Sequence, residues 1–283
     1  MIPPLFRVGL ILTLRCNAEC RHCMFECSPE QTEVMPRRLA EKAIQEARSL
    51  GAEWVSLTGG EPFLEPDLLQ GLIAYAHENG LKTEVVTNGF WGESLETAKN
   101  ELRSLIDAGL DVLNLSIDDF HEEYLSIEKV RNAYLGAVEL GLKVVLMVST
   151  SPDSRLTSDT IPPLLGDDLV QIPGKTRIRN PNAVLFETQF TPVGRGAGLS
   201  YVPSLFTRVK CSEVLRDIGV KPNGDVLPCC GPLGTAIPLG NLPEDSLESI
   251  LEKARNNPRL TRIQDGFDVD GRYSSKCHAC LEN

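Results

Sequence analysis

The sequence predicts an α/β protein, with a parallel sheet in a barrel-sized first domain and a small cysteine-rich domain after it. Three observations predict this arrangement. Short apolar segments alternate with helix-like segments through the first half of the chain, a glycine closes each helix-like segment, and the nine cysteines fall into two separate groups. Alternating strands and helices predict a parallel sheet with right-handed crossovers. The 283 residues suit one barrel plus a small appendix, because α/β barrels commonly take about 200 to 250 residues.

Each predicted element of the first half follows from its hydrophobic pattern. Residues 8–14 form a short apolar run that predicts a buried strand. Residues 35–50 place apolar side chains on one helical face, and Pro36 suits the first turn of that helix. The same unit recurs three times, with strands predicted at 54–57, 83–87 and 112–117 and helices at 67–79, 95–108 and 127–140. The fifth and sixth predicted strands are residues 144–148 and 184–190.

A glycine follows each predicted helix, and these glycines recur at intervals of 29, 29 and 32 residues. They are Gly51, Gly80, Gly109 and Gly141. Glycine just past a helix permits the left-handed turn that returns the chain towards the sheet. The spacing therefore predicts successive strand–helix units of similar length.

The hydrophobic pattern and the composition of the sequence change in its second half. The helical and strand periodicity is lost in the proline-rich residues 151–181, and beyond Val193 glycine, proline and cysteine become frequent. We therefore expect two domains, comprising residues 1–193 and residues 194–283.

Composition and charge exclude several classes of function. Hydrophobic residues make up 42% of the chain, which is enough to bury a substantial core. The 28 basic and 39 acidic residues give a net charge of −11 with no basic patch, which argues against a nucleic-acid partner. The first apolar run is too short to span a membrane and lacks the flanks of a signal peptide. We expect a cytoplasmic protein with no membrane partner.

The first cysteine group lies in the loop that leaves the first predicted strand. Cys16, Cys20 and Cys23 form the pattern C-x3-C-x2-C, at the end of a strand where α/β barrels build their active sites. Three thiolates can hold three irons of a [4Fe-4S] cluster and leave the fourth iron open. A zinc site completed by His22 is disfavoured, because His22 and Cys23 are adjacent and would not readily reach one metal. Cys27 is interpreted as a bystander.

These residues resemble the signature of the radical S-adenosylmethionine (SAM) enzymes. That family places C-x3-C-x2-C after the first strand of a partial (βα)6 barrel, followed by a GGE segment after the second strand. This chain has "TGGEP" at residues 58–62. The resemblance implies that the three cysteines bind the cluster and that its open iron chelates SAM. It also implies that Gly59, Gly60 and Glu61 meet the methionyl ammonium of SAM.

Further SAM contacts are implied at the ends of other strands. His22 occupies the position where such enzymes often place a side chain near the adenine. Ser116 and Asp118, at the end of the fourth strand, could contact ribose, carboxylate or substrate, although a satisfied strand-end hydrogen bond is the alternative for each. The remaining polar candidates for such contacts are Thr87, Asn88, His121 and Gln189.

The second cysteine group has the pattern C-x12-G-x4-C followed by C-x2-C. Its members are Cys211, Cys229, Cys277 and Cys280, with a hairpin predicted around Asn223 and Gly224. Four such thiols could bind zinc or an Fe–S cluster. The arrangement resembles the Twitch or SPASM extension of radical SAM enzymes, which binds auxiliary [4Fe-4S] clusters. We expect one auxiliary [4Fe-4S] cluster, because the cysteines that complete a full SPASM pattern are missing after Cys280.

Two features of the second half have more than one interpretation. Cys230 directly follows Cys229, and neighbouring strand residues point to opposite faces, so one of the two thiols is expected to be free. A free Cys230 could donate a hydrogen atom to a substrate radical, or it could be a spare ligand. Arg195 in "TPVGRG" could pair with a substrate carboxylate or belong to a structural hinge.

The resemblance implies that a reduced cluster cleaves SAM to a 5′-deoxyadenosyl radical, which abstracts hydrogen from a substrate. Relatives with Twitch or SPASM extensions mostly modify ribosomally made peptides, so we expect a peptide-modifying enzyme of natural-product maturation. Epimerisation is favoured over cross-linking or oxidation because of Cys230. The main alternative is a Twitch-type dehydrogenase of a small-molecule alcohol. A remote alternative is that the chain is a non-catalytic protein that binds an Fe–S cluster or zinc.

The expected partners are the peptide or small-molecule substrate and a one-electron donor such as flavodoxin or ferredoxin. Many peptide-modifying relatives carry a recognition domain ahead of the barrel, whereas here the first strand begins within eight residues of Met1. Direct recognition by the barrel and a separate peptide-recognition protein are both compatible with this difference.

Overall fold

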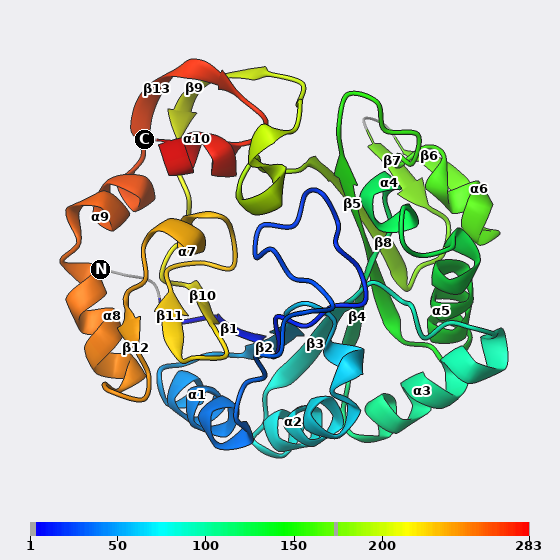
Figure 1. The fold of residues 1–283 in the computed structure, drawn as a ribbon, viewed down its shortest axis with the longest axis horizontal. Coiled ribbons are helices and arrows are strands. Elements are labelled where there is room, and N and C mark those ends of the chain that lie inside the picture. The colour runs from blue at the N-terminus through cyan, green and yellow to red at the C-terminus, as the bar shows by residue number, and fades with distance from the viewer. Residues whose placement is uncertain (1–3, 173–174, 283) are drawn as a thin grey trace.

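Six parallel strands form the centre of the structure, a computed structural model that describes residues 4–172 and 175–282. The six strands follow one another in chain order, each paired in parallel with the next. They are β1 (Arg7–Ile11), β2 (Trp54–Thr58), β3 (Lys82–Thr87), β4 (Val112–Ser116), β5 (Lys143–Thr150) and β8 (Ala183–Gln189). The sheet curves into an incomplete ring, and the loop after β1 lies across its centre (Figure 1). The predicted repetition of strand and helix units is confirmed.

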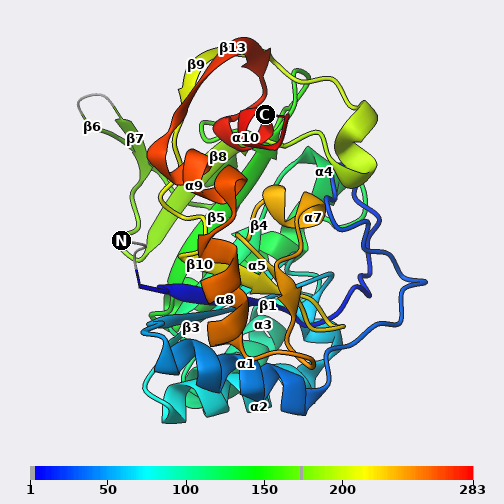
Figure 2. The ribbon, with the colours of Figure 1, turned by 90° about the vertical axis from the view of Figure 1, so that its left-hand side faces the viewer.

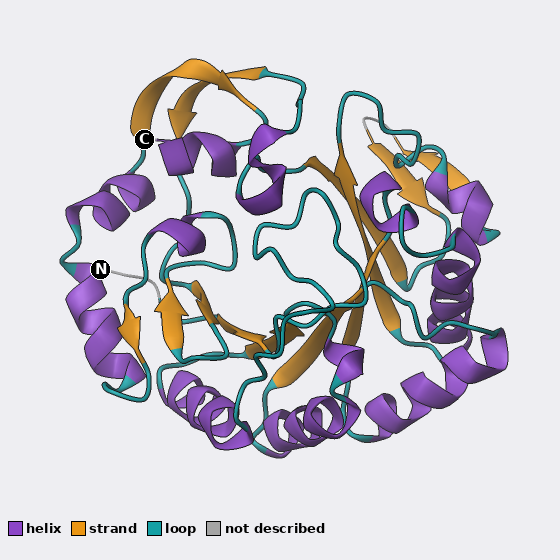
Figure 3. Cartoon of the chain, in the orientation of Figure 1, coloured by secondary structure: helices purple, strands orange, loops and turns teal. Residues whose placement is uncertain are grey.

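Four long helices cover the outer face of the curved sheet (Figure 3). They are α1 (Arg37–Ser49), α2 (Pro66–Glu78), α3 (Leu95–Asp107) and α5 (Ile127–Glu139). All four begin and end within two residues of their predicted bounds. The glycine after each helix has a positive φ, between 75° and 108°, as the spacing of these glycines predicts.

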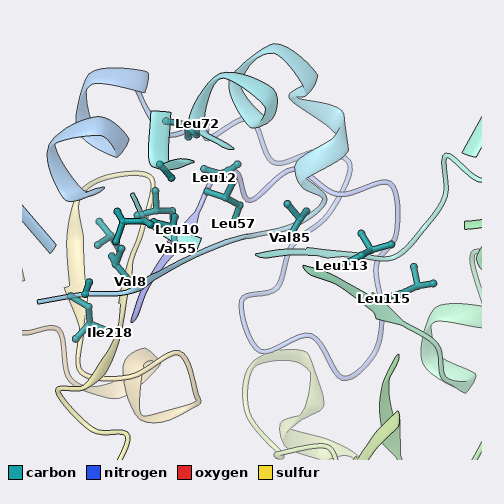
Figure 4. Close-up of a cluster of buried hydrophobic side chains, with 14 of the residues drawn as sticks. Val8, Leu10, Leu12, Val55, Leu57, Leu72, Val85, Leu113, Leu115 and Ile218 are labelled. Carbon is teal, nitrogen blue, oxygen red and sulfur yellow. The ribbon is translucent and has the colours of Figure 1, made fainter. Parts of the chain in front are cut away.

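Alternate residues of the strands fill the core between the sheet and the helices. Val8 and Leu10 of β1 are fully buried, and Figure 4 shows them beside Val55 of β2 and Leu72 of α2. Successive side chains of a strand point to opposite faces. Gly9, between the two core residues, therefore faces the inside of the ring.

Short elements lie within residues 151–181, where the sequence predicts only irregular structure. They are the helix α6 (Ile161–Leu165) and an antiparallel hairpin of β6 (Leu169–Ile172) and β7 (Lys175–Ile178). Each has four or five residues, which is too short to give the periodicity that identifies an element in a sequence. Two more short helices follow β2 and β4 directly, η1 (Pro62–Leu64) and α4 (Asp119–Glu122).

The last third of the chain extends the same sheet. β10 (Asp217–Val220) pairs in parallel with β1, and β11 (Asp225–Leu227) and β12 (Gly240–Asn241) follow in antiparallel order. The predicted hairpin between β10 and β11 is confirmed, with Gly224 at a φ of 92°. The domain boundary before Gly194 stays a prediction, since the sheet continues across it through β1 and β10.

Several short helices and strands make up the rest of the chain after β8. These are η2 (Gly194–Gly198), β9 (Ser204–Val209), α7 (Leu233–Ala236), α8 (Leu247–Arg255), α9 (Pro258–Asp265), β13 (Phe267–Tyr273) and α10 (Lys276–Glu282). β9 and β13 form an antiparallel pair, and Figure 2 shows this pair and α10 together at one end of the molecule. Within the described ranges, no helix is long and apolar enough to cross a membrane.

Replacement of Ile218 tests the docking of β10 on β1. Ile218 is fully buried and lies opposite Val8 in the sheet. Ile218→Ala removes buried methyl groups and leaves a cavity, so we expect the free energy of unfolding to fall by about 2–5 kcal/mol. Thermal unfolding followed by circular dichroism measures this as a lower Tm.

Leu164→Ala is the matched control, because Leu164 is 45% exposed. This substitution should change the free energy of unfolding by no more than about 0.5 kcal/mol, as most surface substitutions do. Equal melting temperatures for the two variants would contradict the packing of β10 against β1.

Candidate active site

A cavity of about 340 Å³ lies at the carboxyl ends of the parallel strands. Its volume is in the range of small-molecule sites. All three cysteines of the C-x3-C-x2-C pattern line it, together with His22 from the same loop. The predicted strand-end residues on its wall are Gly59, Gly60, Thr87, Asn88, Ser116, Asp118, His121 and Gln189. The fold thus brings together almost all residues that the sequence predicts for SAM binding.

The cysteine loop is buried and internally hydrogen-bonded. Cys16 and Cys20 are less than 10% exposed, and burial raises the pKa of Cys16 to about 11. The Cys16 amide donates to the Ser28 carbonyl at 3.0 Å, and the Cys23 amide donates to the Cys20 carbonyl at 3.0 Å. No three cysteine sulfurs of the described residues lie within 4.8 Å of one another.

Cys27 lies in the same buried group as Cys16 and Cys20, packed with Phe120 and Phe190. A hydrogen bond to Cys27, outweighing burial, lowers the pKa of Cys23 to about 6. The same contact and burial raise the pKa of Cys27. Cys27 is therefore a neighbour of the three-cysteine pattern, which the sequence signature does not include. In the sequence, only its position four residues after Cys23 indicates that Cys27 lies near this pattern.

The two glycines of "TGGEP" fix the cysteine loop against the end of β2. The Gly60 amide donates to the Thr13 carbonyl at 2.7 Å, and the next amide donates to the Arg15 carbonyl at 3.0 Å. A Cβ atom on Gly60 would lie 2.1 Å from the Arg15 carbonyl oxygen, and one on Gly59 would lie 2.5 Å from that of Thr13. Glycine is required here because the two backbones approach so closely.

Glu61 is fully buried, and its carboxylate points into the wall of the site. Its oxygens accept hydrogen bonds from the Thr87 hydroxyl at 2.8 Å, the Asn88 amide at 2.8 Å and the Phe63 amide at 3.1 Å. Burial raises the pKa of Glu61 to about 7. The carboxylate holds the end of β3 beside Cys16, whose sulfur lies 3.9 Å from the Asn88 side-chain nitrogen. Its contact with a SAM ammonium stays a prediction.

The buried Asp118 and the half-buried His121 form a pair at the end of β4. Asp118 caps α4, and its Oδ1 accepts from the Phe120 amide, the His121 amide and His121 Nδ1, the last at 2.8 Å. Its Oδ2 accepts from the Ser149 amide at 3.2 Å. Burial opposes ionisation of both groups, but the attraction between the Asp118 carboxylate and the protonated His121 ring outweighs it. This attraction lowers the pKa of Asp118 and raises the pKa of His121.

His22 lies flat against Phe120, with ring centroids 4.4 Å apart, and its edge meets His121 at 5.2 Å. Burial, followed by the charge of His121, lowers the pKa of His22 to about 4, so its ring is neutral near pH 7. Its Nδ1 is buried without a hydrogen-bond partner among the described residues. The ligand atoms of His22, Asp118 and His121 lie within 4.8 Å of one another. Asp118 already accepts four hydrogen bonds, which accounts for this grouping without a metal ion.

The second cysteine group gathers from three separate segments. Cys211 precedes β10, Cys229 follows β11, and Cys277 and Cys280 lie at α10. Burial, with the neighbouring Cys211, Cys229 and Cys277 thiols, raises the pKa of Cys280 to about 12. The pKa of Cys229 is raised to about 11 by burial and by the nearby thiols of Cys277 and Cys211. The fold thus brings the four predicted ligands together.

Cys230 points away from this group. Its sulfur lies 3.4 Å from the Ile218 carbonyl oxygen and would be 2.9 Å from a Cβ on Gly9. Because Gly9 faces the inside of the ring, the Cys230 thiol faces the inside as well. Cys230 is exposed by its accessible surface, but the protein around its sulfur reduces hydration of the thiolate and raises the pKa of Cys230 to about 12. The thiol is therefore protonated near pH 7.

A network of charged side chains lies near this thiol. Arg7 Nη1 binds Glu84 Oε1 at 2.6 Å, and Arg7 Nη2 binds Asp217 Oδ2 at 2.6 Å. All three are among the charges that act on Cys230. The salt bridges tie β1 to β3 and β10.

Comparison with known proteins identifies the family of this chain. A model described as the radical SAM superfamily matches residues 10–167, which include the three-cysteine loop and "TGGEP". The chain belongs to the radical SAM superfamily. A second model, SPASM, described as an iron-sulfur cluster-binding domain, matches residues 211–281 and thus all four cysteines of the second group.

Individual radical SAM relatives resemble the chain over most of its length. The Bacillus subtilis (strain 168) protein YydG, named as a peptide biosynthesis protein, is 24% identical over 96% of this chain and 90% of its own. The structure of BtrN with AdoMet and 2-DOIA has a TM-score of 0.57, with 16% identity, over 94% of this chain and 87% of BtrN. Streptococcus suis SuiB, bound to the precursor peptide SuiA, has a TM-score of 0.54, with 14% identity, over 92% of this chain and 66% of SuiB.

The cofactors of this radical SAM protein follow from the two family matches. They are SAM, a SAM-binding [4Fe-4S] cluster and an auxiliary Fe–S cluster. The residues fit these groups, because the buried Cys16 and Cys20 and the half-buried Cys23 line one cavity and four thiols gather beyond it. Which atoms contact SAM stays a prediction.

Gly60→Ala tests the close approach that fixes the cysteine loop. The new methyl group would collide with the Arg15 carbonyl, so we expect the loop to shift and the protein to lose about 1–3 kcal/mol of stability. Iron bound after anaerobic reconstitution should fall, with the loss confined to the SAM-binding cluster in electron paramagnetic resonance (EPR) spectra.

Gly198→Ala is the matched control, because nothing lies within 4 Å of a Cβ at Gly198. It should bind as much iron as the wild type. A Gly60→Ala protein with wild-type iron content and stability would show that the contact does not position the loop.

Proposed function

We propose that this radical SAM protein inverts the configuration of a carbon atom in a peptide. One observation supports inversion over the competing reactions. The Cys230 thiol lies apart from the four gathered cysteines and faces the inside of the ring, with its sulfur against Gly9 and Ile218. A protonated thiol in that position is suited to deliver a hydrogen atom to a substrate radical inside the ring.

The proposal assigns the three-cysteine loop to the SAM-binding cluster and its surroundings to SAM. When bound and reduced, these cofactors supply a 5′-deoxyadenosyl radical, which can remove hydrogen from an unactivated carbon. Gly59 and Gly60 line the cavity, and their backbone is proposed to meet the methionyl end of SAM. The neutral His22 ring and its unpaired Nδ1 suit an adenine, and Ser116 and Asp118 are proposed to face the ribose.

The proposed inversion moves two hydrogen atoms. The C–H bond on one face of the substrate carbon breaks homolytically, and its hydrogen atom completes 5′-deoxyadenosine. The S–H bond of Cys230 then breaks, and its hydrogen atom forms a new C–H bond on the other face. The remaining Cys230 sulfur radical returns to the thiol by taking up one proton and one electron. A one-electron donor such as flavodoxin or ferredoxin is the proposed source of that electron.

Two of the similar proteins support a peptide as substrate. YydG, which matches 96% of this chain, is named for peptide biosynthesis, and SuiB is bound to a precursor peptide. We propose that the substrate is a ribosomally made peptide, recognised by the barrel itself or by a separate recognition protein. The absence of a membrane-spanning helix in the described residues is compatible with a cytoplasmic enzyme.

A second candidate is oxidation, of a small-molecule alcohol or of a peptide with formation of a cross-link. The gathered Cys211, Cys229, Cys277 and Cys280 support it, because an auxiliary cluster at this position could accept an electron from the substrate radical. In that case Cys230 would be dispensable for product formation.

Cleavage of SAM tests the enzymatic assignment. The chain, reconstituted with iron and sulfide and reduced with dithionite, should convert SAM to 5′-deoxyadenosine and methionine, measured by liquid chromatography and mass spectrometry. A triple variant with Cys16, Cys20 and Cys23 replaced by Ala should form neither. A fully loaded wild type that yields no 5′-deoxyadenosine would exclude the radical SAM reaction.

Cys230→Ala tests the role of the thiol. With a short peptide encoded next to the gene, the variant should still form 5′-deoxyadenosine, but inverted product should fall by about 100-fold or more, because the hydrogen donor is lost. Chiral amino-acid analysis after hydrolysis measures the inversion. Iron content equal to wild type is the control for intact clusters, and normal inversion by this variant would rule out Cys230 as the donor.

A further inference from the structure

Arg195 lies across the cysteine loop and binds it at three points. Its Nε donates to the Cys20 carbonyl at 3.2 Å, and its Nη2 donates to the Cys27 carbonyl at 2.5 Å. Its backbone amide donates to the Cys23 carbonyl at 3.2 Å. A single residue from η2 therefore holds the beginning, middle and end of the segment between Cys20 and Cys27.

The residues on either side of Arg195 allow this close approach. Gly194 has a φ of 56°, and a Cβ there would lie 2.6 Å from the Met24 carbonyl oxygen and 2.7 Å from that of Cys23. A Cβ on Gly196 would lie 3.4 Å from the Cα atom of His22. The "GRG" segment thus packs directly on the loop backbone, and larger residues at Gly194 would push it away.

The charge of Arg195 faces the thiols. The guanidinium is half-buried, lines the cavity, and within the described ranges has no carboxylate within 4.0 Å. A partly buried cation without a negative partner is unfavourable, unless another anion lies close by. Here the guanidinium is bound to the Cys20 and Cys27 carbonyls and lines the same cavity as the thiols of Cys16, Cys20 and Cys23. Three iron-bound thiolates would be the missing anionic partner.

We infer that Arg195 is a positioning residue for the SAM-binding cluster, which locks the cysteine loop and offsets the negative charge of its thiolates. The inference rests on the proposed assignment of Cys16, Cys20 and Cys23 as cluster ligands. It follows that Arg195 raises the reduction potential of this cluster and slows the loss of its iron. The guanidinium is then a fixed part of the cofactor site, and neither a hinge nor a free partner for a substrate carboxylate.

Three variants of the full chain separate the two effects. Arg195→Gln removes both the positive charge and the pair of guanidinium hydrogen bonds to the Cys20 and Cys27 carbonyls. Arg195→Lys keeps the charge but lacks the planar guanidinium that reaches both carbonyls. Arg179→Gln is the matched control, because Arg179 is exposed and binds only the exposed Asp168 among the described residues. Each protein is reconstituted anaerobically, and circular dichroism checks its fold.

The first measurement is the rate of iron release to an excess of a ferrous chelator, without SAM or substrate. Arg195→Gln should release iron from one cluster about tenfold faster than wild type, because it loses charge-assisted hydrogen bonds that hold the cysteine loop. The rate of iron release from Arg195→Lys should lie between those of Arg195→Gln and wild type. Arg179→Gln should release iron at the wild-type rate. Iron release from Arg195→Gln at the wild-type rate would overturn the positioning role.

The second measurement is an EPR-monitored redox titration of the cluster whose signal changes when SAM is added. Arg195→Gln should shift its midpoint potential to a more negative value, and Arg195→Lys should leave it near wild type. Equal shifts in both variants would overturn the charge effect, and Arg195→Met, which also removes the charge, replaces Arg195→Gln if that variant does not fold. A wild type in which SAM changes no EPR signal would instead refute the proposed cluster site itself.

Discussion

The close packing of Gly60 against the Arg15 carbonyl oxygen fixes the position of the cysteine loop. This contact joins the end of β2 to the chain just ahead of Cys16, so the cysteine loop cannot move without breaking a strand-end hydrogen bond. Glu61 continues the same connection by holding the end of β3. Three neighbouring strand ends therefore form one rigid wall, on which the thiols are fixed before any cofactor binds.

The other side of the loop is fixed by a segment that lies far away in the sequence. Arg195 and its flanking glycines close over Cys20, Cys23 and Cys27 from the end of β8. The loop is thus held between the second and the last parallel strand of the barrel. Preorganisation of this kind is what a reactive radical site requires, because the protein must exclude water and hold the reacting atoms in place.

Most of the barrel and the two cysteine groups could be predicted from sequence, since periodic hydrophobic patterns and clustered cysteines are local signals. The helices begin and end within two residues of expectation, and the predicted strand-end residues line one cavity. Contacts between distant segments left no such signal. The pairing of β10 with β1 depends on residues more than 200 positions apart, and the Arg195 contacts with the loop span 168 and 175 positions. The burial of the Glu61 carboxylate in the wall likewise depends on Thr87 and Asn88, which the spacing of "TGGEP" does not reveal.

The separation of Cys229 from Cys230 links the fold to the proposed chemistry. β10 adds to β1 and carries the chain to a point where Cys229 joins the outer thiols and Cys230 faces inward. The most direct measurement of inversion is the mass and configuration of the peptide product after turnover in D2O. The account predicts one deuterium per inverted carbon, because the thiol exchanges its hydrogen with solvent. A product that lacks deuterium and has lost two hydrogens would contradict it and indicate oxidation.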